Sequence, residues 1–133
     1  MSPVADPFVY VSIPATPQHV HVLRTVAGGV AARLDATLDE IEDLRLAVDE
    51  AAGGMLAAGP AATLHLSIDP AERRLKVRLA TDAQVNGQWS PVEARGSFSA
   101  QILAALVDDL SFEADEGHPS ITFSVSLGSS RDR

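Results

Sequence analysis

The chain has 133 residues, of which 46% are hydrophobic and 21% charged, as expected for one soluble globular domain. Its net charge of −8 disfavours direct binding to nucleic acid or to an anionic membrane, and the lack of cysteine excludes disulfides, thiolate nucleophiles and cysteine-ligated zinc. The first residues show no secretory leader pattern and no apolar run approaches about 20 residues, so we expect a cytoplasmic protein without a membrane segment.

The first half of the chain predicts one strand and two helices. Residues 7–14 carry apolar side chains on both faces, as a well-covered strand does. A helix is expected over residues 17–35, where apolar side chains recur at helical spacing, although Gly28-Gly29 lowers its helix propensity. The second helix begins at a capping box over residues 37–40 and is stopped by Gly59-Pro60.

The second half alternates short strands with one further helix. Strict alternation of apolar and polar side chains predicts the strands, and apolar residues at helical spacing predict the helix. The expected elements are strands at 62–69 and 74–80, a loop over 81–96, a helix at 97–110, and strands at 111–114 and 121–127.

The alternating strands indicate a sheet with one buried face and one wet face. The helices then cover a single face of that sheet. We therefore expect an α+β two-layer sandwich, with a mixed, mainly antiparallel sheet and three helices on one face. The chain is expected to form a single domain over residues 1–128, followed by a disordered tail at 129–133.

Several common catalytic motifs are absent from the sequence. It contains no P-loop, no G-x-G-x-x-G fingerprint and no G-x-S-x-G elbow. His19 and His21 stand two residues apart on a predicted helix, so their imidazoles point in different directions. His65 and His118 are isolated. We therefore expect no metal site.

The most informative stretch is the acidic helix that contains Asp49-Glu50. Residues 35–50 hold seven acidic side chains against Arg45 alone, a surface that suits a basic partner. Glu50 and Gly54 share one helical face at the edge of the apolar stripe, because they stand four residues apart. By spacing alone, Glu50 reads as a solvated acid, although a carboxylate at such an edge can also face a pocket between helices.

Three stretches of the sequence together resemble a known family. The run LRLAVDEA at 44–51 follows IPATPQHVHVLRTVAGGVAARL, and FSAQILAALVDDLSFE begins at residue 98. In this order and spacing they resemble anti-sigma factors of the serine-protein-kinase type, which belong to the histidine-kinase-like (GHKL) ATPase superfamily. The order of the predicted elements is similar to that fold over nearly the whole chain, so the resemblance implies a histidine-kinase-like ATPase domain.

The resemblance implies that Glu50 holds the position of a catalytic base. In the family, a glutamate acts on a substrate serine hydroxyl, and an asparagine four residues later holds Mg²⁺, which prefers oxygen ligands. Glu50 matches the glutamate here. Gly54, however, stands at the asparagine position and offers no side-chain ligand.

The two other nucleotide motifs of the family are eroded as well. Asp82 matches the aspartate that reads the adenine amine, but the glycines that follow it in the family are missing. Gly96 is the one remaining glycine of the motif that opens the third helix, where backbone N–H groups meet phosphates, and Phe98 would crowd this opening. With all three motifs eroded, we expect ATP and Mg²⁺ binding to be weak or lost, no cofactor to be required, and Glu50 to be vestigial.

The leading hypothesis is an anti-sigma-like regulator of transcription, of the stress-response type, with little or no enzyme activity. The resemblance implies that it sequesters an RNA polymerase sigma factor, that an anti-sigma antagonist protein releases that factor, and that the chain forms a homodimer. Two alternatives stay open. The chain could be an active ATP-dependent serine kinase that phosphorylates the antagonist, or a sensor that uses the old nucleotide cavity for another ligand.

Overall fold

The computed structural model describes residues 9–84 and 89–128. The tail predicted at 129–133 and the first two residues of the strand predicted at 7–14 lie outside this part of the chain. The described elements are β1 (Val9–Pro14), the 3₁₀ turn η2 (Pro17–His19), α1 (Val20–Arg33), α2 (Leu38–Ala57), β2 (Thr63–Ala71), β3 (Arg74–Thr81), α3 (Pro91–Arg95), α4 (Phe98–Leu106), β4 (Asp108–Asp115) and β5 (His118–Ser126).

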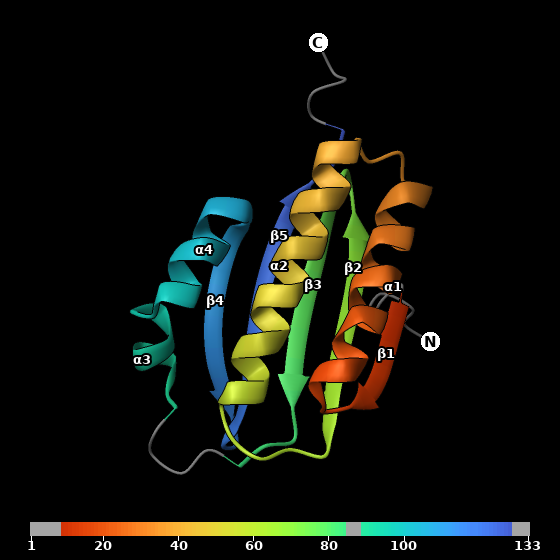
Figure 1. Cartoon of the computed structure of the whole chain (residues 1–133). Helices are drawn as coiled ribbons and strands as arrows, with labels where there is room; N and C mark the ends of the chain where they lie inside the picture. The colour runs from red at the N-terminus through yellow and green to blue at the C-terminus, as the bar shows by residue number, and fades with distance from the viewer. Residues whose placement is uncertain (1–8, 85–88, 129–133) are drawn as a thin grey trace, which may run out of the picture.

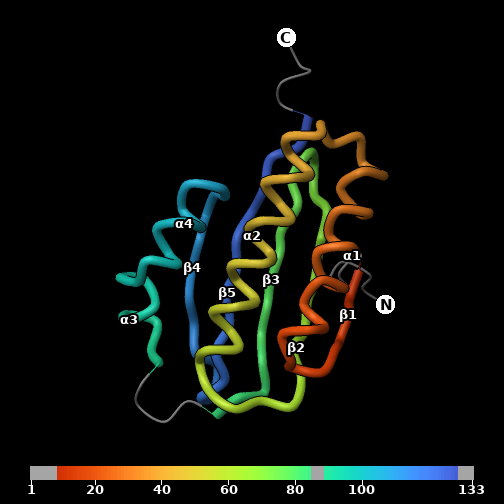
Figure 2. Tube along the Cα trace, viewed as in Figure 1, coloured from red at the N-terminus to blue at the C-terminus, as the bar shows by residue number. Residues whose placement is uncertain are grey.

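The strands form one sheet in the order β1-β2-β3-β5-β4. Figure 1 and Figure 2 show α1, α2, α3 and α4 on one face of this sheet, with α2 over its middle and no described helix on the opposite face. The predicted α+β sandwich with helices on one face is thus confirmed. Each neighbouring pair of described strands is antiparallel, so the parallel component expected of a mixed sheet is not found among them.

A short additional helix, α3, occupies part of the segment predicted as a loop. The Ser90 hydroxyl accepts a hydrogen bond from the backbone N–H of Glu93 at 3.1 Å, and Pro91 is the first helical residue. Serine followed by proline favours turns in general, but it is also a favourable helix start. The helix predicted at 97–110 ends earlier than expected, at Leu106.

Helix α1 runs through Gly28 and Gly29 without a break. Gly28 is buried against α2, and a Cβ there would lie 3.2 Å from Cδ of Arg45 and 3.6 Å from Cγ2 of Ile41. Apart from its chain neighbours and the backbone of its own helix, no described atom lies within 4 Å of the same position on Gly29. Gly28 therefore lets the two helices approach closely, whereas Gly29 only lowers the helix propensity.

The capping box predicted for the second helix is present at the start of α2. The backbone N–H of Glu40 donates to the Thr37 hydroxyl at 3.1 Å, and the backbone N–H of Thr37 donates to Oε1 of Glu40 at 2.8 Å. The Glu40 carboxylate also accepts from the backbone N–H of Gly128, at 3.0 Å to Oε1 and 2.9 Å to Oε2. Glu40 therefore ties the start of α2 to the backbone just after β5.

The hydrophobic core lies between the helices and the inner face of the sheet. Its central helix is α2, and β5 lies beneath it in the interior of the sheet. The largest fully buried side chain is Phe123, on β5. Other fully buried members are Leu23, Leu44, Met55, Leu64, Leu66, Ile68, Leu75, Leu79 and Leu103.

Candidate functional site

A cavity of about 230 Å³ lies between α2, α3, α4 and the inner face of β4 and β5. Gly54 lines it from α2, and Phe112 and Ile121 line it from the sheet. The remaining lining residues are Ala57, Trp89, Glu93, Ala94, Ser97 and Ser99. Most of this surface is apolar, and Glu93 is the one ionisable side chain among the described lining residues. The cavity can hold an apolar group, but its single charge has the wrong sign for a phosphate.

Gly54, which the sequence placed in the nucleotide site, is part of this cavity. Glu50 lies one turn earlier on α2, is half-buried, and is not among the lining residues. In the described part of the chain, no hydrogen bond or ion pair engages its carboxylate. Glu50, at the position predicted for the base, and Gly54, at the position of the magnesium ligand, therefore lie on one helix. Only Gly54 lines the cavity.

Asp82 lies outside the cavity and caps the start of β2. Its Oδ1 accepts hydrogen bonds from the backbone N–H groups of Ala62 at 2.9 Å and Thr63 at 3.0 Å. The bond from Thr63 is the main cause that lowers the pKa of the Asp82 carboxyl below its ordinary value of 3.8, with the bond from Ala62 adding to it. This oxygen is thus engaged by the chain's own backbone rather than directed at a ligand.

The lowered pKa of Asp82 predicts a contribution to stability that depends on pH. Because the folded state favours the ionised carboxylate, the contribution is present above about pH 4 and is lost as pH falls through the folded-state pKa. Asp82 is exposed, so solvent screening limits it to less than about 1 kcal/mol. We expect Asp82→Asn to lower the melting temperature by a few degrees at pH 7 and to have little effect at pH 3, which calorimetric melts over this range will measure. An equal loss at both pH values would contradict this expectation.

Gly96 ends α3 rather than opening a phosphate loop. Its backbone N–H donates to the Glu93 carbonyl at 3.2 Å. The next residue, Ser97, caps α4: its hydroxyl accepts from the backbone N–H of Ala100 at 3.1 Å and donates to the Ala94 carbonyl at 2.7 Å. The start of α4 therefore already has a side-chain cap.

The structure brings together only part of the site predicted from sequence. Gly54 lines the cavity, Gly96 lies next to a lining residue in the chain, and Asp82 is held elsewhere. Phe112 and Ile121 were not singled out in the sequence, because an inward-facing residue of a strand looks like any other core position. Their alternation on β4 and β5 indicates burial but not which helix they face.

The exposed face of α2 carries a second candidate site around Leu46. This side chain is 56% exposed. Glu42, Asp43, Asp49 and Glu50 stand three or four residues from it and therefore surround it on the helix surface. Nε of Arg24 lies 3.6 Å from Oδ1 of Asp49, so one of these acids is partly neutralised. An apolar side chain within a ring of carboxylates is suited to a protein partner with a basic rim.

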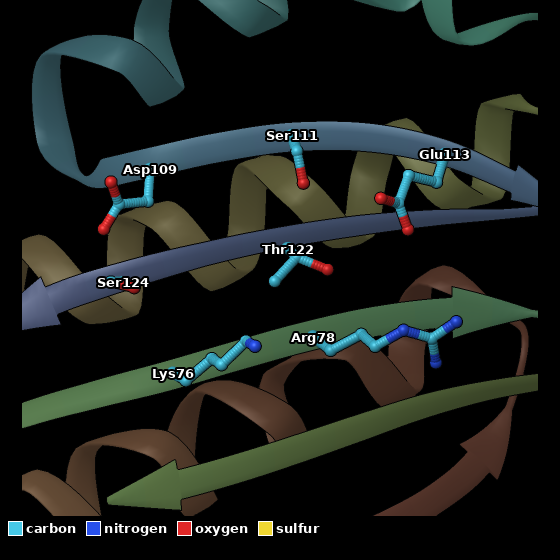
Figure 3. Close-up of a pocket in the computed structure, with 7 residues that line it drawn as sticks. All are labelled: Lys76, Arg78, Asp109, Ser111, Glu113, Thr122 and Ser124. Atoms are coloured by element: carbon cyan, nitrogen blue, oxygen red, sulfur yellow. The ribbon is translucent and has the colours of Figure 1, made fainter. Parts of the chain in front are cut away.

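The uncovered face of the sheet holds a wider hollow of about 540 Å³, shown in Figure 3. Lys76 and Arg78 line one side of the hollow on β3, and Asp109 and Glu113 line the other side on β4. The hydroxyl side chains of Thr122 and Ser124 lie between them. Asp109 also accepts a hydrogen bond from Nη2 of Arg74 at 2.6 Å. Because the two sides carry opposite charges, the hollow has no preference for anions over cations.

The histidines give no metal site in the described part of the chain. No group of three or more potential metal-ligating side chains is found there. His19 Nδ1 lies 2.6 Å from the Thr16 hydroxyl, and His118 Nδ1 lies 2.9 Å from the Ala83 carbonyl oxygen. Among the same residues, no helix is both long enough and apolar enough to cross a bilayer.

The sheet order, the helices on one face and the cavity beside α2 and α4 define a histidine-kinase-like ATPase fold. The RsbU and RsbW domain structure from Mycobacterium tuberculosis matches with a TM-score of 0.64 and 16% identity, covering 91% of this chain and 33% of that one. The histidine kinase domain of a blue-light-activated kinase from Erythrobacter litoralis matches with a TM-score of 0.58 and 13% identity, covering 90% of this chain and 64% of that one.

Sequence comparison places the chain within that fold. It is 35% identical over 118 residues to the anti-sigma-F factor RsbW of Mycobacterium tuberculosis, covering 88% of this chain and 68% of the relative. It is also 25% identical over 151 residues to the serine-protein kinase RsbW of Bacillus licheniformis, covering 100% of this chain and 92% of that protein. The chain belongs to the RsbW family of anti-sigma factors and serine-protein kinases. No protein-family model matches it.

Proposed function

We propose that this chain is an anti-sigma regulator that binds and sequesters an RNA polymerase sigma factor and does not use ATP. An anti-sigma antagonist protein would release the sigma factor. Relatives in the family are named anti-sigma-F factor and serine-protein kinase, which supports the regulatory class. The lining of the cavity supports the loss of ATP binding. Gly54 offers no metal ligand there, and Glu93 supplies a negative charge where a nucleotide would need positive or neutral groups.

The loss of nucleotide binding is tested directly with Mg-ATP. Calorimetric titration of the purified chain should give no saturable heat, with a dissociation constant weaker than about 1 mM, equivalent to less than about 4 kcal/mol of binding free energy. Trp89 is the only tryptophan and lines the cavity, so its emission is an independent reporter. Micromolar binding in either assay would contradict the proposal and favour the serine-kinase alternative, with Glu50 as its base.

We assign sigma binding to the surface around Leu46. A central apolar side chain within a charged rim matches the general arrangement of protein interfaces, which have an apolar centre and a polar rim. Where a central residue dominates binding, its truncation costs about 2 kcal/mol or more. The four surrounding acids favour a partner with a basic surface and increase its rate of association. Weakening of the complex by added salt would follow from the same charges.

A matched pair of variants on α2 tests this surface. Leu46→Ala should weaken sigma binding at least about 30-fold, whereas Leu38→Ala should leave the affinity unchanged. Leu38 is a suitable control because it is also an exposed leucine of α2, at 74%, but it lies at the first residue of the helix and outside the surface around Leu46. The sigma factor would be recovered first by pull-down from the native cytoplasm and then titrated by calorimetry. Failure to recover any sigma factor would contradict the proposed function. Equal affinities of the two variants would contradict only the proposed binding surface and leave the function standing.

We also propose that the chain forms a homodimer, through the edge of the sheet at β1. Val9–Pro14 carries no charged residue, whereas the other edge, β4, carries acidic side chains at Asp108, Asp109, Glu113 and Asp115. Charged edges resist strand pairing, and an uncharged edge permits it. A two-fold axis would then pair two copies of β1 in antiparallel fashion. Sedimentation velocity over a range of concentrations will establish the mass.

A further inference from the structure

Gly54 lines the cavity beside α2 and adds no side chain to it. A Cβ at Gly54 would meet only Cδ1 of Ile121, at 3.7 Å, which is an ordinary contact. Glycine inside a helix costs about 1 kcal/mol relative to alanine, and no neighbour in the described part of the chain requires it here. Close packing therefore does not require glycine at residue 54, and a larger side chain there would reduce the cavity.

The lining of the cavity defines the chemistry of its ligand. Trp89, Phe112 and Ile121 offer apolar and aromatic walls. The Ser97 hydroxyl is already bonded at the start of α4, whereas neither the Ser99 hydroxyl nor the exposed Glu93 carboxylate has a side-chain hydrogen bond among the described residues. Both free groups can accept a hydrogen bond, and Glu93 repels anions. A ligand that fits is therefore apolar over most of its surface and carries a hydrogen-bond donor.

We propose that this cavity binds a small, mainly apolar molecule with a hydroxyl or amine group, and that it discriminates against anions of the same size. Its volume of about 230 Å³ has room for a single substituted ring, although the pocket is partly open to solvent and not enclosed. The aromatic part packs against Trp89 and Phe112, and the donor points to Ser99 and Glu93. The proposal is independent of sigma binding, because Leu46 does not line the cavity.

Benzyl alcohol and benzoate are matched probes for this proposal, because they share a ring and differ in charge. Trp89 emission of the full chain should change saturably with benzyl alcohol, and benzoate should bind at least about tenfold more weakly. Transfer of magnetisation between the bound ring and the Ile121 methyl groups, measured by NMR on the unaltered chain, should locate the probe without any variant.

Two neighbouring glycines of α2 supply a matched pair of variants. Gly54→Leu places a side chain in the cavity and should abolish binding of benzyl alcohol. Gly53→Leu makes the same gain in helix propensity. Apart from chain neighbours and the backbone of α2, no described atom lies within 4 Å of a Cβ there, and the residue does not line the cavity, so binding should be retained. Equal affinity for the two probes, equal binding by the two variants, or no magnetisation transfer to Ile121 would each overturn the proposal.

Discussion

Replacing Phe123 with alanine should lower the free energy of unfolding by about 4 kcal/mol, because the change removes a large buried side chain and leaves a cavity. Phe123 is fully buried and lies on β5, an interior strand under α2. A domain of this size has a total stability of only about 5–15 kcal/mol. Urea denaturation followed by circular dichroism should therefore show a much lower midpoint with an unchanged slope.

Thr122→Ala is the control for this prediction. Thr122 is the neighbouring residue of β5 and faces the hollow on the uncovered side of the sheet, so its truncation creates no buried cavity. We expect it to change stability by less than about 1 kcal/mol. A loss of similar size in both variants would mean that the effect comes from the strand itself and not from core packing.

Glu40→Ala should have the second largest effect, lowering the free energy of unfolding by about 3 kcal/mol. The carboxylate accepts hydrogen bonds from the backbone of Thr37 and from Gly128, and bonds to a charged group contribute about 1.5–3 kcal/mol each. Its position at the start of α2 also complements the helix dipole. Thermal melts should show a fall in the melting temperature of roughly 10 °C.

Two further variants separate the contributions of Glu40. Glu40→Gln keeps one acceptor oxygen and the capping box, so it should lose about half as much stability as the alanine variant. Glu42→Ala removes an exposed acid from the same helical turn and should stay within about 0.5 kcal/mol of the parent chain. If Glu40→Ala were no worse than Glu42→Ala, the bond to Gly128 would contribute nothing to stability.

Elements with signals at both ends could be predicted closely from sequence. The capping box and Gly59-Pro60 place α2 within a residue of its observed bounds, Leu38–Ala57. Alternation placed β3 within a residue of its observed bounds, whereas β2 ends two residues later than predicted and β5 begins three residues earlier. The five-residue helix α3 was missed because it is too short to show helical periodicity, and its Ser-Pro start is equally typical of a turn.

The site was predictable only where its residues share one element. Glu50 and Gly54 are linked by helical spacing, and the family resemblance gave that spacing a meaning. The cavity also has lining residues from the sheet, Phe112 and Ile121, which face α2. Which strand residues face α2 depends on how the layers pack, and the sequence pattern does not show this. The backbone donors that hold Asp82 are Ala62, just before β2, and Thr63, its first residue, about 20 residues earlier in the chain. No local pattern in the sequence predicts this contact.

The position of β5 has a consequence for how the protein is made. The last of the described strands, β5, lies between β3 and β4 rather than at an edge of the sheet. During synthesis, β3 is therefore left without its second neighbour until residues up to Ser126 have left the ribosome, and an unpaired strand edge favours aggregation. Folding of the sheet therefore cannot be completed before β5 has been made, so truncation before β5 should yield insoluble protein rather than a smaller stable domain.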